Sequence, residues 1–314
     1  MILPRFMYRK AASIEEALAL YTQSGPEALY LSGGTDLMPR VKLRLAKPAM
    51  LIDLKGITDL ATVEEENGRI RIGALSAISD LEEHPVVQEY FPALRASLKA
   101  TSCETLRMRG TIGGNLLQNS RCLFYNQSEF WRKSKGFCLK MGGDKCNAVP
   151  GATVCLANYC SDNAPALLTL SAEIRLAGPD GQREIPLTDL YSGKSGKPFL
   201  LNAGEILTHV LVPKRKTTGD YEKLRIRGAI DYPLLGVALT TFGGKSRFAV
   251  GAIGPKPNVF ETDSLDEQGL QEVVKEARQA ARPAPNTVVD TAYRRDMIAI
   301  LVHRVAGRAA EEAN

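Results

Sequence analysis

The stretch EALYLSGGTDLMPRVKLRL, residues 27–45, decides how this chain folds. Its short apolar run ends abruptly at the double glycine Gly33-Gly34, which a threonine and an aspartate follow. Glycine lets the backbone approach a ligand closely and point successive N–H groups at one anion. The stretch therefore predicts a loop able to cradle a phosphate, although a double glycine alone also fits an ordinary tight turn.

A second glycine loop, GTIGGNLLQNS, covers residues 110–120. It again places Gly-Gly beside threonine and asparagine, whose side chains can add hydrogen-bond donors. Neither loop is the phosphate loop of NTPases or the G-x-G-x-x-G dinucleotide turn, so the mechanisms of those motifs do not transfer. Taken alone, the two loops are compatible either with tight turns or with a pair of phosphate cradles.

Helix and strand patterns alternate around these loops. Ser13 is expected to cap a helix over residues 13–23, with Glu15 and Glu16 in its first turn. A linker is expected at residues 212–219. The other expected elements are a buried strand in 49–57, alternating strand residues Ile70 and Ile72 before a capped helix near Ser76 or Ser79, a helix over 91–102, a strand and turn pattern over 164–190 with Asp180-Gly181 at the turn, and two amphipathic helices at the end.

The bulk composition narrows the class of protein. The 314 residues are 44% hydrophobic and 24% charged, as in a soluble globular protein with several domains. No apolar run approaches the roughly 20 residues of a membrane span, and a cytoplasmic location is expected. The net charge of +5 is mild and indicates no nucleic-acid partner. The three histidines, His84, His209 and His303, are scattered and predict no catalytic constellation.

Residues 121–160, called the cysteine loop below, contain five of the six cysteines. In a reducing compartment such a cluster indicates metal or redox chemistry more than disulfides. Its cysteines are separated by 15, 7, 8 and 4 residues, without the paired C-x2-C spacing of structural zinc sites. A 4Fe-4S cluster tolerates irregular spacing. The spacing alone leaves a cluster, zinc and reduced structural thiols open, and Cys103 is expected in a helix of the core.

Several motifs together resemble the FAD-binding subunits of the xanthine dehydrogenase and carbon monoxide dehydrogenase family. The resemblance implies an α+β fold of the PCMH-like type, with two FAD-binding subdomains at 1–57 and 58–213, a carboxyl-terminal α+β domain at 214–314, and a cysteine-rich insertion loop. The motifs are LSGGTDLMPRVKLRLAKPAMLIDLKGI, RIRIGALSAISDLEEHP, GTIGGNL, SDNAPALL and KLRIRGAIDYPLLGVAL.

The resemblance also implies a set of FAD-binding residues and no catalytic residue on this chain. In the family the two glycine loops hold the FAD diphosphate. Asp162 stands where a carboxylate usually hydrogen-bonds FAD, and Lys223 stands near the flavin; their alternatives are a helix or turn cap and an exposed strand lysine. The implied residues are Leu31, Ser32, Gly33, Gly34, Thr35, Asp36, Thr111, Gly113, Gly114, Asn115, Gln118, Asp162 and Lys223.

Removing residues 121–160 joins GGNLLQNS to SDNAPALLTL, the uninterrupted family pattern, so the cysteine loop is interpreted as an insertion. It resembles the insertion of the 4-hydroxybenzoyl-CoA reductase branch, which carries a 4Fe-4S cluster. Cys160 falls outside that pattern and is expected to be buried. Phe124, Tyr125, Phe130, Trp131 and Phe137 are expected around the cluster or at a subunit contact. The implied cluster ligands are Cys122, Cys138, Cys146 and Cys155.

This resemblance implies an electron relay. Reduced ferredoxin would supply electrons through 4Fe-4S and FAD to a 2Fe-2S subunit and a molybdopterin subunit, in a dimer of heterotrimers that reductively removes a phenolic hydroxyl to give benzoyl-CoA. Residues 121–145 carry a net charge of +4, which fits either ferredoxin docking or a plain solvated surface. One alternative is the FAD subunit of an oxidising hydroxylase acting on an aldehyde, a purine or another aromatic compound. Another is a non-enzymatic interaction module whose cysteine loop is held together by zinc.

Overall fold

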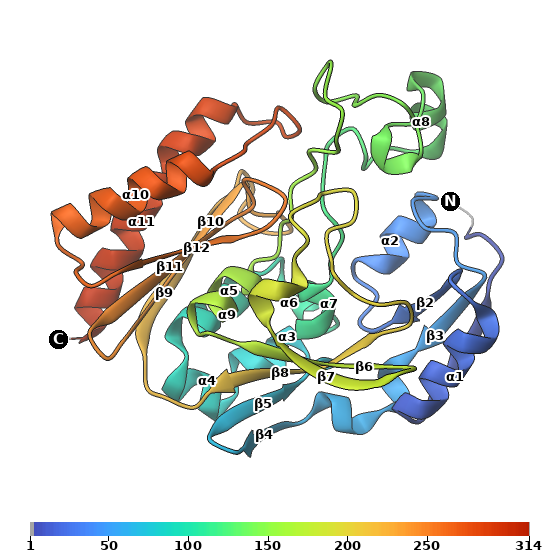
Figure 1. The fold of residues 1–314 in the computed structure, drawn as a ribbon, viewed down its shortest axis with the longest axis horizontal. Helices are drawn as coiled ribbons and strands as arrows, with labels where there is room; N and C mark the ends of the chain where they lie inside the picture. Colours follow the sequence, from blue (N-terminus) through green and yellow to red (C-terminus); the bar gives the residue numbers. More distant parts are fainter. Residues whose placement is uncertain (1–2, 314) are drawn as a thin grey trace.

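The computed structural model describes residues 3–313 and contains three β-sheets with helices packed around them (Figure 1). The first sheet is parallel, with strand order β1-β3-β2. The other two sheets are antiparallel, with orders β4-β5-β8-β6-β7 and β12-β11-β10-β9. The predicted α+β class is therefore confirmed, whereas the domain boundaries at residues 57 and 213 stay predictions.

The first sheet and its helices form the amino-terminal part of the fold. The side chain of Ser13 accepts a hydrogen bond from the Glu16 N–H at 3.1 Å, so the predicted cap of the first helix is confirmed. The elements are β1 (Met7–Lys10), α1 (Ile14–Ser24), β2 (Ala28–Leu31), α2 (Leu37–Lys42), β3 (Met50–Asp53) and the short 3-10 helices η1 (Leu54–Gly56) and η2 (Thr58–Ala61).

The second sheet packs against a group of short helices, and their apolar side chains form the largest buried cluster. The predicted capped helix begins at Ile78, but no side chain caps it, because Ala77 occupies the cap position. The elements are β4 (Val63–Glu66), β5 (Arg69–Gly73), α3 (Ile78–Glu82), α4 (Pro85–Tyr90), α5 (Pro92–Ala100), α6 (Glu104–Arg107), α7 (Ile112–Leu116), α8 (Glu129–Lys135), η3 (Leu139–Met141), α9 (Asn163–Thr169), β6 (Glu173–Gly178), β7 (Gly181–Pro186), η4 (Leu187–Leu190) and β8 (Ile206–Pro213).

The third sheet is covered by the two carboxyl-terminal helices, which confirms the predicted pair of amphipathic helices. The expected linker at 212–219 is shorter than predicted, because strands occupy both of its ends and leave only residues 214–217 between them. The elements are β9 (Thr218–Leu224), β10 (Leu235–Phe242), β11 (Lys245–Gly251), β12 (Asn258–Thr262), α10 (Glu267–Ala280) and α11 (Thr291–Ala313).

Residues 164–169 correct one prediction, because they form most of helix α9 and no part of a strand and turn. All seven residues of α9 are buried, and the helix contacts α5, β10 and β11. A helix that is apolar on every side shows no amphipathic period in the sequence. The strand and turn pattern holds only for β6 and β7, with Asp180 in the turn between them and Gly181 as the first residue of β7.

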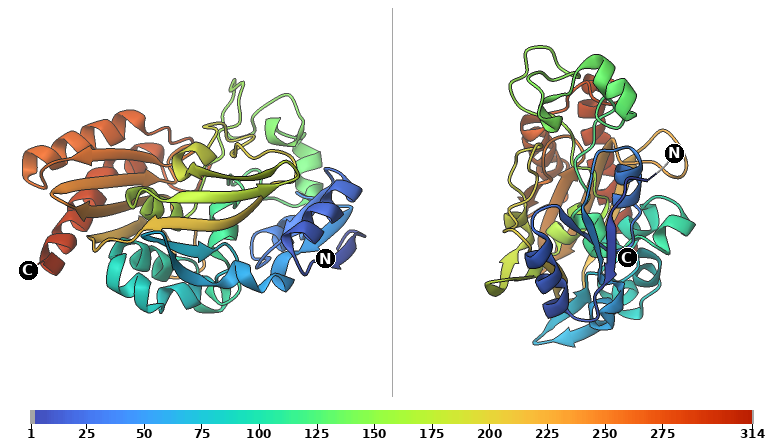
Figure 2. Two further views of the ribbon diagram at one scale, coloured as in Figure 1. Left: turned by 60° about the horizontal axis from the view of Figure 1, so that its bottom comes forward. Right: turned by 90° about the vertical axis from the view of Figure 1, so that its right-hand side faces the viewer.

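The cysteine loop projects from one end of the molecule. Figures 1 and 2 show it beyond the edges of the sheets, with α8 near α2 on one side. On its other side the Leu123 N–H donates to the carbonyl of Asn286, in the segment between α10 and α11. The loop thus touches both the amino-terminal and the carboxyl-terminal parts of the fold.

Candidate functional site

The first glycine loop leaves the carboxyl end of β2, where Leu31 pairs with Asp53 of β3. Gly33 lies against the backbone of the chain before the second glycine loop, and a Cβ atom there would fall 1.8 Å from the carbonyl oxygen of Arg109. Gly34 has φ of +78°, a left-handed conformation that favours glycine. Both glycines are therefore required by the backbone geometry alone.

The N–H groups of this first loop are available to a ligand. Among the hydrogen bonds of residues 3–313, those of Gly33, Gly34 and Thr35 donate to no protein acceptor. Buried or ligand-facing N–H groups need an acceptor, and consecutive free donors form an anion-binding concavity. The loop has the donors that the phosphate interpretation requires.

The second glycine loop is built differently. A Cβ atom on Gly113 would meet the Cβ of Ala74 at 2.7 Å, so this glycine permits close packing. The hydroxyl of Thr111 accepts a hydrogen bond from the Gly114 N–H at 3.1 Å and lies 2.6 Å from the hydroxyl of Ser32 in the first loop. Since the N–H groups of residues 112–115 all bond within the protein, this loop offers side chains more than free N–H groups.

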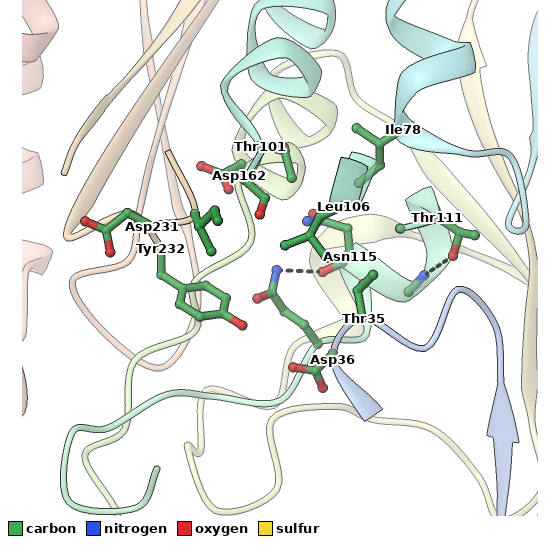
Figure 3. Close-up of a pocket in the computed structure, with 15 residues that line it drawn as sticks. Thr35, Asp36, Ile78, Thr101, Leu106, Thr111, Asn115, Asp162, Asp231 and Tyr232 are labelled. Carbon is green, nitrogen blue, oxygen red and sulfur yellow. Dashed lines mark hydrogen bonds between the residues drawn. The ribbon is translucent and has the colours of Figure 1, made fainter. Parts of the chain in front are cut away.

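Two adjoining cavities lie on either side of the glycine loops. The second cavity is the larger of the two, and both open to solvent. Figure 3 shows the first cavity, which Thr35 and Asp36 line together with Asn115 of α7 and Tyr232 from the segment after β9. The residues common to both cavities are Thr35, Asp36, Thr111 and Gly114. The two predicted glycine loops therefore meet at one site.

Asp162 and Lys223 form a buried ion pair at the wall of the first cavity. Their charged atoms are 3.0 Å apart, and the exposed fractions of their side chains are 5% and 2%. Tyr221 donates to the same carboxylate oxygen at 2.9 Å. Burial raises the pKa of Asp162, whereas Lys223 and Tyr221 oppose that rise. The alternative of an exposed lysine at position 223 is wrong, and Asp162 stands at the start of α9 without capping it.

The segment 225–234 contributes residues that the sequence interpretation missed. It joins β9 to β10 and brings Asp231 and Tyr232 to the first cavity. The ammonium of Lys223 donates to the Asp231 carbonyl at 3.0 Å and thereby attaches this segment to the buried ion pair. Most hairpin loops have 2–5 residues, so the length of this connection was the indication that it does more than turn the chain.

Arg121, the first residue of the cysteine loop, connects that loop to the glycine cavities. Its guanidinium pairs with Asp36 and lies 4.4 Å from the ring centroid of Tyr232. Its backbone forms an antiparallel bridge with Asn158, in which Asn158 N–H donates to the Arg121 carbonyl at 2.7 Å. The two ends of the cysteine loop are thus adjacent, and the paired segments at Arg121 and Asn158 are called its neck below.

Asn286 holds this neck from the carboxyl-terminal side. Its exposed fraction is 1%, and its amide oxygen accepts a hydrogen bond from the Asn158 side chain at 3.0 Å. Its amide nitrogen donates to the carbonyl of Leu156. Because Leu156 follows Cys155 and Leu123 follows Cys122, Asn286 fixes the backbone beside both cysteines.

The four predicted cluster ligands line one cavity, called the cysteine cavity below. All four are free thiols, and burial raises the pKa of Cys122 and of Cys155. In residues 3–313, no three His, Cys, Asp or Glu side chains approach one another closely enough to hold a single metal ion. The four thiols share the lining of this cavity.

The positions of the remaining cysteines and of the aromatic residues agree only in part with the predictions. Cys160 is buried, as predicted, and burial raises the pKa of its thiol to about 12. Cys103 is not in the core: it precedes α6 and is half-buried. Phe124 lines the cysteine cavity and lies 6.2 Å from Trp131 between ring centroids, whereas Phe130 is 84% exposed, which leaves a subunit contact as its remaining predicted role.

Lys140 is a second residue that the sequence interpretation missed. It lies in η3 and lines the cysteine cavity, and its ammonium lies 5.1 Å from the ring centroid of Tyr125. Burial lowers the pKa of Lys140 to about 8. Nothing in the local sequence distinguishes this lysine from its exposed neighbours Lys133 and Lys135, because its partners lie elsewhere in the chain.

Comparisons with known proteins agree with this geometry. Residues 4–215 match the family described as the FAD binding domain in molybdopterin dehydrogenase. The chain is 32% identical over 310 residues to the FAD-binding subunit of an aldehyde oxidoreductase from Escherichia coli (strain K12), covering 94% of this chain and 97% of that protein. It is 30% identical over 300 residues to the carbon monoxide dehydrogenase medium chain of Hydrogenophaga pseudoflava, covering 93% and 90%.

Solved structures give the same result. The chain superposes on a chain of the carbon monoxide dehydrogenase of Hydrogenophaga pseudoflava with a TM-score of 0.80, 27% identity and coverage of 99% of both chains. Fold and site thus define a flavin-binding subunit of an oxidoreductase. The chain belongs to the family of FAD-binding domains in molybdopterin dehydrogenases, which replaces the alternative of a non-enzymatic interaction module. No helix within residues 3–313 is long and apolar enough to span a bilayer.

Proposed function

We propose that this chain is the FAD and 4Fe-4S electron-transfer subunit of a molybdenum-dependent 4-hydroxybenzoyl-CoA reductase. The observation that carries the cluster is that Cys122, Cys138, Cys146 and Cys155 line one cavity whose neck adjoins the glycine loops. FAD supplies one-electron and two-electron chemistry at the glycine loops. The chain's own residues would hold the two redox groups and would exclude water around them.

The glycine loops fit FAD for a chemical reason. FAD has two bulky halves joined by a diphosphate, and the two cavities adjoin at Thr35, Asp36, Thr111 and Gly114. The free N–H groups of Gly33, Gly34 and Thr35 would hold the diphosphate, and Asn115, Gln118, Asp162 and the segment 225–234 would line the space beside it. Lys223 would act through Asp162 and Asp231, with which it is hydrogen-bonded.

The cysteine cavity fits a cluster better than a single ion. A 4Fe-4S cube takes one thiolate per iron, so its ligands surround a volume. Zinc needs four ligands within roughly 2.3 Å of one point. The four thiols line one cavity, which supports the first arrangement, and the neighbouring Lys140 and Arg121 would supply positive charge to balance four thiolates and a cluster.

Partner subunits complete the proposed enzyme. The relatives named above are subunits or medium chains, which supports partners that carry molybdopterin and 2Fe-2S groups, in a dimer of heterotrimers. Reduced ferredoxin would deliver electrons at the basic surface of the cysteine loop, where Lys133 and Lys135 are exposed. Electrons would then pass through FAD to the molybdenum subunit, which removes the phenolic hydroxyl to give benzoyl-CoA.

In a second candidate function, electrons flow in the opposite direction. The relatives have the names of an aldehyde oxidoreductase and of carbon monoxide dehydrogenases, which favours the FAD subunit of an oxidising molybdenum hydroxylase with a structural cluster. Such an enzyme would oxidise an aldehyde, a purine or another aromatic compound and pass the electrons outward from FAD.

One preparation tests both the proposed FAD and the proposed 4Fe-4S cluster. The complex is purified without oxygen, and FAD, iron and sulfide are measured on this chain and on variants with each of the four cysteines changed to serine. We expect the unmodified chain to carry one FAD together with iron and sulfide. Iron and sulfide should be lost in the Cys122, Cys138, Cys146 and Cys155 variants and kept in Cys160→Ser. Iron that survives all four substitutions would refute the ligand set.

Turnover assays then separate the two directions. Consumption of reduced ferredoxin with 4-hydroxybenzoyl-CoA supports the reductase, whereas oxidation of an aldehyde with an artificial electron acceptor, and no reductase activity, supports the alternative. Replacing Lys133 and Lys135 by glutamate should weaken the salt dependence of ferredoxin-linked turnover, since charged surfaces steer encounter. An unchanged salt dependence contradicts docking at that surface.

A further inference from the structure

The ammonium of Lys140 connects the cysteine cavity to the second glycine loop. It donates to the side-chain oxygen of Asn119 at 2.7 Å, to the carbonyl of Ser120 at 3.3 Å and to the carbonyl of Ser195 at 3.1 Å, and it also bonds the Ser120 hydroxyl. Asn119 and Ser120 directly follow Gln118, which lines the first cavity. One side chain therefore lies between the two candidate redox sites.

This cation lacks a carboxylate partner. Among the ion pairs of the described residues, none includes Lys140, and all of its hydrogen-bond acceptors are neutral. The guanidinium groups of Arg40 and Arg121 carry charge of the same sign near Lys140, and the thiols of Cys155 and Cys122 line the same cavity as Lys140. A partly buried charge without a compensating charge is costly, and the cysteine cavity that Lys140 lines contains the thiols that could compensate it.

The surroundings of Lys140 differ from those of Lys133 and Lys135, two of the three other lysines in the cysteine loop. Lys133 and Lys135 are exposed, and Lys133 pairs with Glu129 at 3.7 Å. Solvent screens such surface charges, whereas a charge in a desolvated setting acts strongly on its neighbours. Lys140 alone among these three is placed to act on a group in the cysteine cavity.

We propose that Lys140 is a positioning residue for electron transfer: it is the fixed counter-cation of the group bound in the cysteine cavity and raises the reduction potential of that group. This inference rests on the proposed 4Fe-4S cluster. One-electron reduction adds one negative charge to the cluster, breaks no bond and needs only the low-potential donor named above. A nearby positive charge stabilises the reduced form more than the oxidised form.

The test is a redox titration of the assembled complex, followed by the electron paramagnetic resonance signal of the reduced cluster. Lys140→Gln removes the charge and keeps an amide donor for Asn119 and Ser120, whereas Lys140→Arg keeps the charge. We expect a shift to more negative potential for Lys140→Gln and a potential near that of the unmodified protein for Lys140→Arg. Lys135→Gln, an equal loss of charge at an exposed site, should shift the potential much less.

Each other outcome has a defined meaning. A Lys140→Gln potential equal to that of Lys135→Gln, or shifted in the positive direction, overturns the inference. If Lys140→Gln loses the cluster, retention of iron and sulfide in Lys140→Arg supports a requirement for the charge, and loss in both variants contradicts it. Absence of iron and sulfide from the unmodified complex would instead refute the proposed cluster itself, so the two failures are distinguishable.

Discussion

The glycine loops and the cysteine loop are specified by opposite means. Gly33 and Gly113 occupy places where even a Cβ atom would collide with neighbouring backbone or with a neighbouring side chain, so the absence of side chains sets that geometry. The cysteine loop depends on side chains that reach distant segments, above all Lys140 and Asn286. The comparison teaches that close packing can specify a cofactor cradle, whereas an insertion without a core of its own depends on a few anchors and on what it binds.

The largest expected effect is that of Gly33→Ala. The new Cβ would lie 1.8 Å from the Arg109 carbonyl oxygen, which forces the two glycine loops apart. We expect loss of bound FAD and a decrease in the free energy of unfolding of about 4 kcal/mol or more. Flavin absorbance after gel filtration and chemical unfolding measure both effects.

Gly307→Ala is the matched control for that change. Gly307 is exposed within α11, and a Cβ atom there meets nothing within 4 Å. This variant should keep its FAD and gain about 0.5–1 kcal/mol, because alanine favours a helix over glycine. Equal behaviour of the two variants would mean that the close contact at residue 33 does not constrain the cradle.

The next effect is that of Lys223→Met, which leaves the Asp162 carboxylate buried without its cation. Breaking a buried ion pair on one side costs about 3–5 kcal/mol. Lys216→Met removes a lysine from an exposed pair with Glu89, and should cost no more than about 1 kcal/mol. Urea unfolding of the two variants compares them, and a cost for Lys223→Met as small as that of Lys216→Met would contradict a buried pair.

A smaller effect on stability is expected when the cysteine loop is shortened. Residues 123–156 are replaced by Asn-Gly, which keeps the bridge between Arg121 and Asn158. The shortened chain should bind FAD at the unmodified stoichiometry, lose iron and sulfide, and lose about 1–3 kcal/mol because Asn286 loses buried hydrogen bonds. Loss of FAD would contradict the contrast between the glycine loops and the cysteine loop, because the FAD site would then depend on the insertion.

The smallest effect concerns pH and His209 of β8. Burial beside Arg71 lowers the pKa of His209 to about 4, from an ordinary value of 6.5. Between these values the unfolded chain binds a proton that the folded chain does not, so stability is fully present above pH 6.5 and falls as the pH is lowered towards 4.

We expect His209→Gln to remove about 1 kcal/mol of that pH dependence, measured by unfolding at pH 7 and pH 4.5. The cysteine loop contains no histidine, so the shortened chain should show the same dependence as the full chain. A difference between the two chains would place the titrating group outside the sheet.

The sequence could predict those features that depend on neighbouring residues. The Ser13 cap, the abrupt end of β2 at the glycines and the two final helices follow from short-range patterns. Helix α9 was missed because it is buried on all sides. The roles of Lys140 and Asn286 were missed because their partners Ser195 and Leu156 lie 55 and 130 residues away, and no local pattern encodes such contacts.

The contact between Gly33 and Arg109 also bears on biosynthesis. The two positions lie in different predicted subdomains, and each glycine loop is incomplete until the other is present. While the chain is being translated, its first hundred residues thus lack a finished binding surface for FAD. FAD should therefore be captured only after the second glycine loop, residues 110–120, has been made, and a fragment ending before that loop should stay colourless.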